Sequence, residues 1–305
     1  MFLELDDHGI SVLKALASDT RASILRLLLH TPLTVSELAA KLNLSKAIVS
    51  RHIRLLEDAR IIKLQDNLEA ADSRKKNFIV AVDHIALNLP QKLHLPFKVI
   101  TNEIKLGYYS NFSVTPTCGL ASQAKIIGKL DDQRTFVSND RIDASLLWFA
   151  EGFVEYMIPN DFNHNFTAEL LELSLELSSE FPGSNNNWPS DIAFYINDVF
   201  LGTWTAPGNF SDVRGKLTPN WWDNELSQYG LLKHLRVTKK DTGIDGQKIS
   251  SVTLAHLKIE DSPFIKLRIG IDGNSKNKGG LTIFGEHFGN YPQNILLKLF
   301  YTEAE

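Results

Sequence analysis

The sequence predicts an α+β protein of two domains, a winged helix-turn-helix followed by an all-β antiparallel sandwich or jelly roll. Its 305 residues exceed the roughly 100–200 of one typical domain. Residues 1–90 contain one glycine and carry apolar residues at helical spacing, whereas residues 91–305 contain all five tryptophans and many glycine- and proline-rich turns. Two prolines in LNLPQKLHLPF mark the boundary, so we expect one domain over 1–90 and another over 91–305.

Four amphipathic helices are expected in the first domain, because apolar residues recur there at helical spacing. Thr34 and Glu37 have the spacing of a capping box, which fixes the start of the third helix. Ser45 can cap the fourth. The expected helices cover residues 9–17, from Ser18 or Asp19 to Pro32, from Thr34 to Asn43, and from Ser45 to about Ala59.

The apolar period changes to that of strands after the fourth helix. Residues 61–65 and 77–82 flank a polar tip, which predicts a hairpin and completes a winged helix-turn-helix. The fourth helix would enter a major groove, where short side chains approach base edges and cations neutralise phosphates. The residues expected to contact DNA are Ser45, Lys46, Ser50, Arg51, His52 and Arg54 on the helix and Arg74, Lys75 and Lys76 on the wing. For His52, which lies beside the inward-facing stripe, packing and DNA contact are equally compatible with the pattern.

Two segments, LKALASDTRASILRLLL and TVSELAAKLNLSKAIVSRHIRLLEDARII, resemble the winged-helix domain of ArsR-type bacterial repressors over about residues 10–82. The resemblance implies a homodimer that reads a palindromic DNA operator. Metal-sensing members carry a cysteine pair before the recognition helix or a carboxylate and histidine site on a last helix. The corresponding stretch here, residues 35–39, has no cysteine, and a last helix is absent or replaced, so no metal site is expected.

Strands dominate the expected second domain. Leucines alternate with polar residues over 171–178, and Asn197-Asp198 has the composition of a two-residue hairpin turn. Turn signals recur between the apolar runs, which is typical of a sandwich or jelly roll. The expected strands cover residues 171–178, 193–196, 199–204, 252–259, 264–271, 281–284 and 295–301.

Two long loops, over residues 178–191 and 205–230, combine aromatic, amide and charged residues, as a carbohydrate site requires. For any one of these tryptophans, packing in the core is the alternative. The second domain also resembles the C-terminal half of a group of predicted ArsR-type regulators, which has a sandwich similar in kind to carbohydrate-binding modules. The candidate ligand-binding residues are Trp188, Asp191, Trp204, Asp212, Arg214, Trp221, Trp222, His287 and Asn290.

Charge and composition exclude several classes of protein. The net charge of −4 argues against binding nucleic acid through bulk positive charge. Residues 1–90 are nearly neutral, with 12 Lys/Arg and 11 Asp/Glu, so a DNA contact would come from a local patch. A single cysteine excludes an internal disulfide framework and a thiolate-rich zinc site. Because no apolar run reaches ~18 residues and the N-terminus is acidic, we expect a cytoplasmic protein.

The sequence gives little evidence of a catalytic site. Asp131-Asp132, Glu151 with Glu155, and Glu286 could serve as carboxylate pairs in glycoside chemistry. Adjacent aspartates are more typical of turns, the histidines form no HExxH motif, and no phosphate-binding glycine loop is present in the sequence. We therefore expect no catalysis, no cofactor and no metal.

These patterns together predict a transcriptional regulator, expected to be a repressor. Its winged helix would bind a double-stranded DNA operator as a homodimer, and its sandwich would sense a small molecule, with a carbohydrate as the favoured class. Two alternatives remain. The second domain could be a sugar-processing enzyme with an appended winged helix, or a sandwich that serves only dimerisation or protein interaction.

Overall fold

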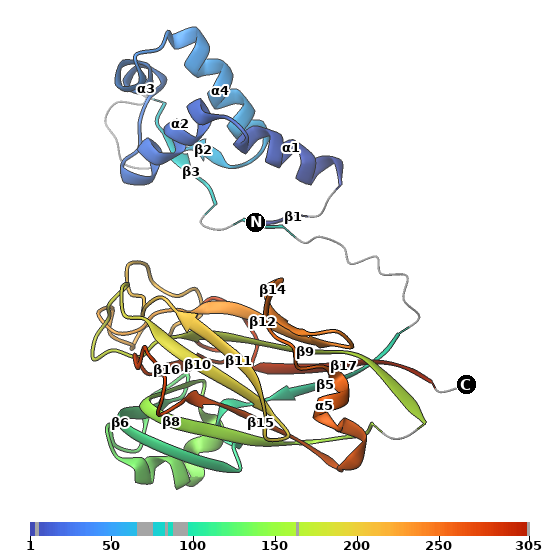
Figure 1. Ribbon diagram of the computed structural model, residues 1–305. Coiled ribbons are helices and arrows are strands. Elements are labelled where there is room, and N and C mark those ends of the chain that lie inside the picture. The colour runs from blue at the N-terminus through green and yellow to red at the C-terminus, as the bar shows by residue number, and fades with distance from the viewer. Residues whose placement is uncertain (4–5, 66–75, 83–84, 88–96, 163–164, 304–305) are drawn as a thin grey trace. The chain divides into compact units, whose positions relative to one another are not determined.

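The computed structural model describes the chain except for residues 4–5, 66–75, 83–84, 88–96, 163–164 and 304–305 (Figure 1). Contacts divide the chain into two compact units, Met1–Leu95 and Pro96–Glu305. No helix in the described residues is long and apolar enough to span a membrane.

The first unit is a winged helix-turn-helix. Thr34 and Glu37 form the expected capping box, and the Ser45 hydroxyl accepts a hydrogen bond from the backbone N–H of Ile48. Asn43 adopts a left-handed conformation that ends the third helix and makes the turn. The helices are α1 (Asp7–Leu16), α2 (Asp19–His30), α3 (Val35–Leu42) and α4 (Lys46–Asp58).

A short hairpin follows α4, as the sequence predicts. Strand β2 (Ile62–Leu64) pairs antiparallel with β3 (Phe78–Val80), while the tip of the hairpin lies outside the described residues. A second small sheet pairs β1 (Phe2–Leu3) in parallel with β4 (Ala86–Leu87). Fully buried apolar residues from all four helices and β2 make the core of this unit, among them Val12, Ile24, Leu38, Val49, Leu56 and Ile62.

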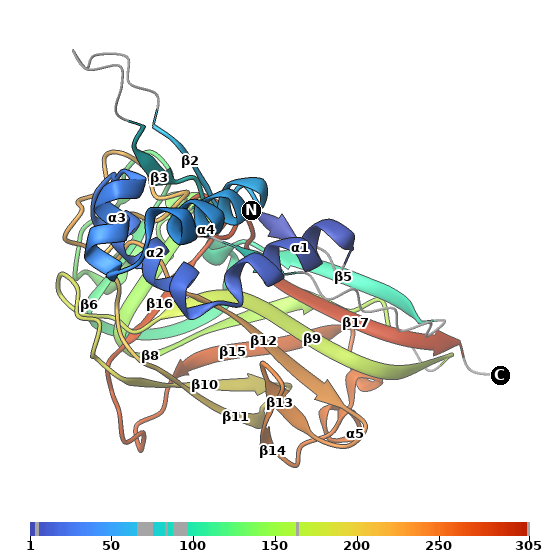
Figure 2. The ribbon, with the colours of Figure 1, turned by 90° about the horizontal axis from the view of Figure 1, so that it is seen from above.

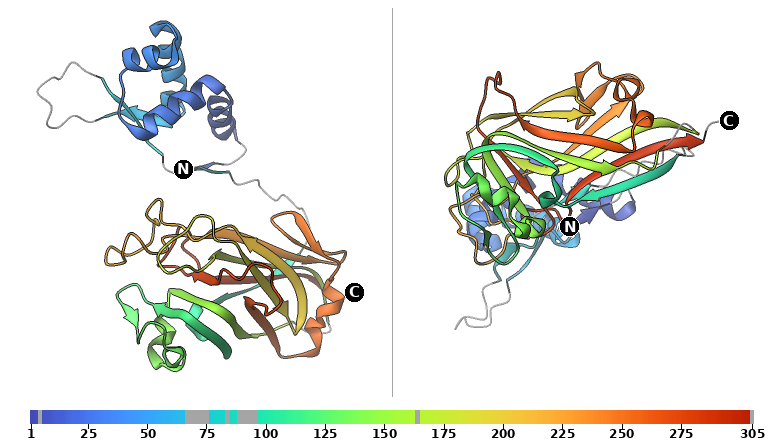
Figure 3. Two further views of the ribbon diagram at one scale, coloured as in Figure 1. Left: turned by 60° about the vertical axis from the view of Figure 1, so that its left-hand side comes forward. Right: turned by 90° about the horizontal axis from the view of Figure 1, so that it is seen from below.

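The second unit is an antiparallel sandwich, as predicted (Figures 1 to 3). One layer has the order β7-β6-β8-β15-β10-β11 and the other β5-β17-β9-β12-β13-β14. Strand β16 joins them at one end, because it pairs with the beginning of β8 and with the end of β9. The strands are β5 (Lys98–Ile104), β6 (Asn111–Ala121), β7 (Ile126–Ile127), β8 (Leu146–Pro159), β9 (Phe166–Ser178), β10 (Ser190–Ile196), β11 (Val199–Ala206), β12 (Leu231–Thr238), β13 (Thr242–Ile244), β14 (Gln247–Ser250), β15 (Phe264–Ile271), β16 (Leu281–Phe284) and β17 (Ile295–Glu303).

The hairpin turn expected between β10 and β11 is confirmed. Asn197 and Asp198 both have positive φ, 50° and 64°, as a turn of this length requires. The strand expected over residues 252–259 is wrong. That segment contains a short helix, α5 (Leu254–Leu257), whose first turn is capped by Thr253 and whose apolar residues Leu254 and Leu257 are buried together.

Strand β9 differs from its expected half-buried state, because both of its faces are covered. Its leucines belong to the sandwich core, while Glu176 on the other face is buried beneath the loops that follow β11 and β16. The Glu176 carboxylate accepts hydrogen bonds from the backbone N–H groups of Gly230, Asn290 and Tyr291. Burial raises the pKa of Glu176 to about 7. This carboxyl therefore pins two long loops to the outer face of the sheet.

Candidate functional site

The outer side of α4 is exposed and cationic. Lys46, Ser50, Arg51 and Arg54 are exposed, while Val49, Ile53 and Leu56 on the opposite side are buried. None of these three cations forms an ion pair with another described residue, so their charges are available to phosphates. Ser45 is also exposed, but its hydroxyl already caps the helix.

His52 lies on a different side of α4 and is half-buried. Its Nδ1 is 3.4 Å from Nη1 of Arg21. The other two guanidinium nitrogens of Arg21 donate hydrogen bonds to the backbone carbonyls of Lys14 and Ala15. Burial, and then the charges of Arg21 and Arg51, lower the pKa of His52. The structure therefore places His52 where α1, α2 and α4 meet.

Of the expected wing cations, Lys76 is exposed, and Arg74 and Lys75 lie outside the described residues.

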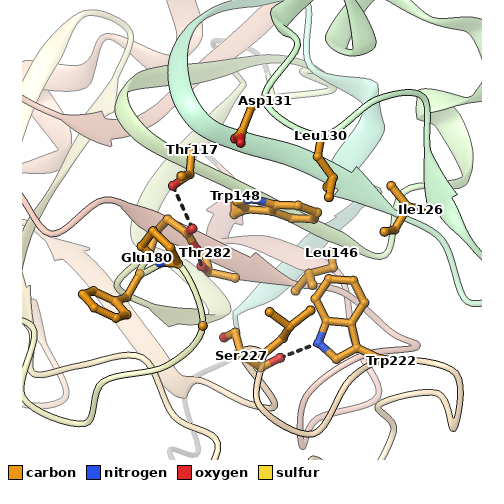
Figure 4. Close-up of a pocket in the computed structure, with 14 residues that line it drawn as sticks. Thr117, Ile126, Leu130, Asp131, Leu146, Trp148, Glu180, Trp222, Ser227 and Thr282 are labelled. Atoms are coloured by element: carbon orange, nitrogen blue, oxygen red, sulfur yellow. Dashed lines mark hydrogen bonds between the residues drawn. The ribbon is translucent and has the colours of Figure 1, made fainter.

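The second unit contains a cavity of about 260 Å³ beside the bridging strand β16 (Figure 4). Most of its wall is apolar, with two tryptophans, Trp148 from β8 and Trp222 from the loop after β11. Strands β6, β7 and β8 of one layer, the bridging strand β16 and the two long loops contribute to it. The lining residues are Thr117, Ile126, Leu130, Asp131, Leu146, Trp148, Glu180, Phe181, Pro182, Gly183, Trp222, Leu226, Ser227 and Thr282.

Glu180 supplies the main polar group of the cavity. The hydroxyl of Thr117 donates a 2.9 Å hydrogen bond to Oε1 of Glu180. The hydroxyl of Thr282 lies 3.3 Å from Oε2 and 3.1 Å from the carbonyl oxygen of Ser179, and it shares its one proton between them. Burial raises the pKa of Glu180 to about 7, and the nearby charge of Asp131 acts in the same direction. Threonines of β6 and β16 therefore hold a carboxyl that titrates near neutral pH.

Trp148 and Trp222 pack against each other in the wall of the cavity. Their rings meet edge to face with centroids 5.8 Å apart, and Nε1 of Trp222 donates a 2.9 Å bond to the carbonyl of Ser227. Trp148 lies against Gly119 of β6, where a Cβ would fall 2.3 Å from the indole ring. The Oγ of Ser227 is buried and has no hydrogen-bond partner in the part of the chain that the structure describes.

Comparison with known proteins finds a family match within the first unit. Residues 18–63 match the family model described as "Bacterial regulatory protein, arsR family". Residues 18–63 form an ArsR-family helix-turn-helix domain. Over 49 residues the chain is 45% identical to the HTH-type transcriptional regulator Rv2034 of Mycobacterium tuberculosis. That match covers 16% of this chain and 46% of the relative, which is less than half of its length.

Solved structures resemble each unit. HlyU from Vibrio cholerae is 25% identical over 25% of this chain and 77% of its own, with a TM-score of 0.22. The carbohydrate-binding module CBM36, in complex with calcium and xylotriose, is 10% identical over 65% of this chain and 98% of its own, with a TM-score of 0.28. At these TM-scores neither similarity supports a conclusion about the function of this chain.

Outside the ArsR-family domain, the predicted ligand-binding residues are not brought together. Only Trp222 lines the cavity. Trp221 is next to it, 40% exposed, and its Nε1 donates to the carbonyl of Gln123. Trp188 is 38% exposed and packs edge to face on Phe181.

The other six candidates serve mainly to hold strands and loops. Asp191 accepts from Thr205 and Asn277, Trp204 packs against the core beneath Lys233, and Asp212 accepts from Tyr229. Arg214 donates to Asn224 and to the carbonyl of Pro219, His287 lies 3.6 Å from Glu286, and Asn290 accepts from the N–H of Lys216.

Trp148, Glu180 and Ser227 line the cavity but are not among the ligand-binding residues that the sequence predicts. The sequence offers Asp131 only as one of a carboxylate pair with Asp132, and in the structure the two have different partners. Asp131 accepts from the N–H of Cys118, whereas Arg134 hydrogen-bonds Asp132 and lowers its pKa to about 2. The signal that could have found Glu180 is its position directly after the apolar alternation of β9.

Proposed function

We propose that this protein is a DNA-binding transcriptional regulator that reads an operator as a homodimer through α4. The observation that supports it best is the row of unpaired cations on the exposed side of α4, within a domain that matches the arsR family. As in other helix-turn-helix proteins, this helix would lie in the major groove. Ser50 would face base edges, and Lys46, Arg51 and Arg54 would neutralise phosphates.

The charge distribution supports a local DNA contact. Residues 91–305 carry 20 Lys/Arg and 25 Asp/Glu, so the second unit would be repelled by a duplex. Binding would therefore depend on few phosphate contacts, all made by the ArsR-family domain. A repressor needs no more than this, because occupancy of an operator by a dimer is sufficient to block a promoter.

The sandwich would bind a small effector in the cavity between Trp148 and Trp222. The effector would regulate the protein only if it binds the DNA-competent and DNA-incompetent states with different affinities. A carbohydrate effector remains a prediction from the sequence. The residues on which that prediction is based do not come together in one site.

Selection from random duplexes with the full-length protein tests the proposed function. We expect a palindromic site with half-sites about one helical turn apart, and two chains per duplex in sedimentation experiments. Recovery of no enriched sequence would contradict sequence-specific reading. A complex of one chain per duplex would contradict the homodimer.

A further inference from the structure

The cavity beside β16 has an apolar end and an acidic end (Figure 4). Ile126, Leu130 and Leu146 gather at one end of the Trp148 ring, together with Trp222. Glu180 and Asp131 lie at the other end. A flat or short apolar group would therefore bury its surface at one end, with a polar group directed toward the other.

No cation balances the acidic end. The lining residues within the described chain include two carboxyls and no lysine, arginine or histidine. Neither Glu180 nor Asp131 forms an ion pair with another described residue. The partners of Glu180 are threonine hydroxyls and a backbone N–H, which satisfy its oxygens without neutralising its charge. Because Glu180 is buried, its charge is costly without a counterion, and a cationic occupant would supply one.

We propose that this cavity binds a small amine, with its ammonium group between Glu180 and Asp131 and its apolar body against Trp148 and Trp222. The ammonium also gains from the aromatic face of a neighbouring tryptophan. A volume of about 260 Å³ restricts the occupant to one ring or a short chain. The inference deepens the proposed effector site, but binding itself does not depend on the DNA-binding role.

The lining disfavours the other ligand classes. A monosaccharide presents hydroxyls around its whole ring, and the apolar end would leave those hydroxyls unpaired. An anion would meet the two carboxyls. A neutral apolar molecule would fill the apolar end but would leave the carboxyls without a counterion.

The test compares matched probes on the full-length protein by isothermal titration calorimetry at pH 8. The probes are 2-phenylethylamine, 2-phenylethanol, 3-phenylpropanoate and D-xylose. We expect the amine to bind roughly tenfold or more tightly than the alcohol, because a charge-assisted contact is worth about 1.5–3 kcal/mol. Equal affinity for amine and alcohol, or tighter binding of the anion or the sugar, would overturn the proposal.

Variants locate the site. Glu180→Gln removes the charge and keeps the shape, so amine affinity should fall roughly tenfold while alcohol affinity stays within about twofold. Asp131→Asn is a second variant, at an exposed position, with the same expected direction. Glu151→Gln is the control, since Glu151 is exposed on β8 and does not line the cavity. Unchanged amine affinity in both cavity variants would overturn the assignment.

DNA measurements separate this inference from the proposed function. An amine that binds without changing operator affinity would support the ligand class and contradict the sensing role. Operator binding by a protein that binds no amine would support the DNA-binding role and contradict the ligand class.

Discussion

The hydroxyl of Thr117 donates a 2.9 Å hydrogen bond to Glu180, which links the middle of β6 to the segment after β9. The carboxyl is buried at the edge of an aromatic cavity, and burial raises its pKa to about 7. The proposed amine site and the pH behaviour of the sandwich both depend on this arrangement.

Amine binding should strengthen as pH rises from 6 to 8. Above its pKa of about 7 Glu180 is ionised and attracts the ammonium, whereas below it the neutral carboxyl does not. The amine keeps its proton over this range, as a lysine does. Calorimetry of 2-phenylethylamine at several pH values measures the effect. An affinity that is constant across the range in wild type, or a pH dependence that persists in Glu180→Gln, would contradict it.

Glu180→Gln should make the protein's stability less sensitive to pH. The ordinary carboxyl pKa of 4.5 is raised in the folded state, so the folded protein binds this proton more tightly than the unfolded chain. The contribution of Glu180 to the free energy of unfolding is therefore greatest below pH 4.5, where it reaches up to about 3 kcal/mol. It is lost as the pH rises through about 7. Urea unfolding at pH 5 and pH 8 should show a smaller decline in the variant than in wild type. Equal declines would argue against the raised pKa.

Glu176→Ala should destabilise the sandwich by about 2 kcal/mol or more. The carboxylate accepts backbone hydrogen bonds from Gly230, Asn290 and Tyr291, and its loss leaves one buried and two partly buried donors unpaired. Urea unfolding against Glu151→Ala, an exposed glutamate of β8, measures the difference. Equal stabilities of the two variants would show that Glu176 does not hold the loops.

Gly119→Ala should disturb the tryptophan wall. The added methyl group would lie 2.3 Å from the Trp148 ring, so the indole must move. We expect a stability loss of about 1–3 kcal/mol and a shift in tryptophan fluorescence. A spectrum and stability identical to wild type would contradict the close packing of Trp148 on β6.

The sequence predicted the first unit well because its signals are local. The capping box of Thr34 and Glu37, the Ser45 cap and the inward stripe of α4 each lie within one or two helical turns. Local patterns were less reliable for residues 252–259. Their apolar residues suit a strand, but the cap at Thr253 and the joint burial of Leu254 and Leu257 favour a helical turn.

The cavity could not be predicted from local patterns. Thr117, Trp148, Glu180 and Thr282 meet only because β6 pairs with β8 and because β16 bridges β8 and β9. The sequence favours the loop tryptophans because aromatic and amide residues cluster around them. In the structure that cluster separates, and only Trp222 faces the cavity.

The affinity of the full-length protein for its selected operator tests the central proposal most directly. Fluorescence anisotropy would compare wild type, the Arg51→Ala, Arg54→Ala double variant, and Arg26→Ala, an exposed cation on α2. Reading through α4 predicts that the double variant loses roughly tenfold or more in affinity. Its salt dependence should also become shallower by roughly one to two units of slope, while Arg26→Ala resembles wild type. Operator affinity and salt dependence unchanged in the double variant would show that α4 is not the DNA-reading helix.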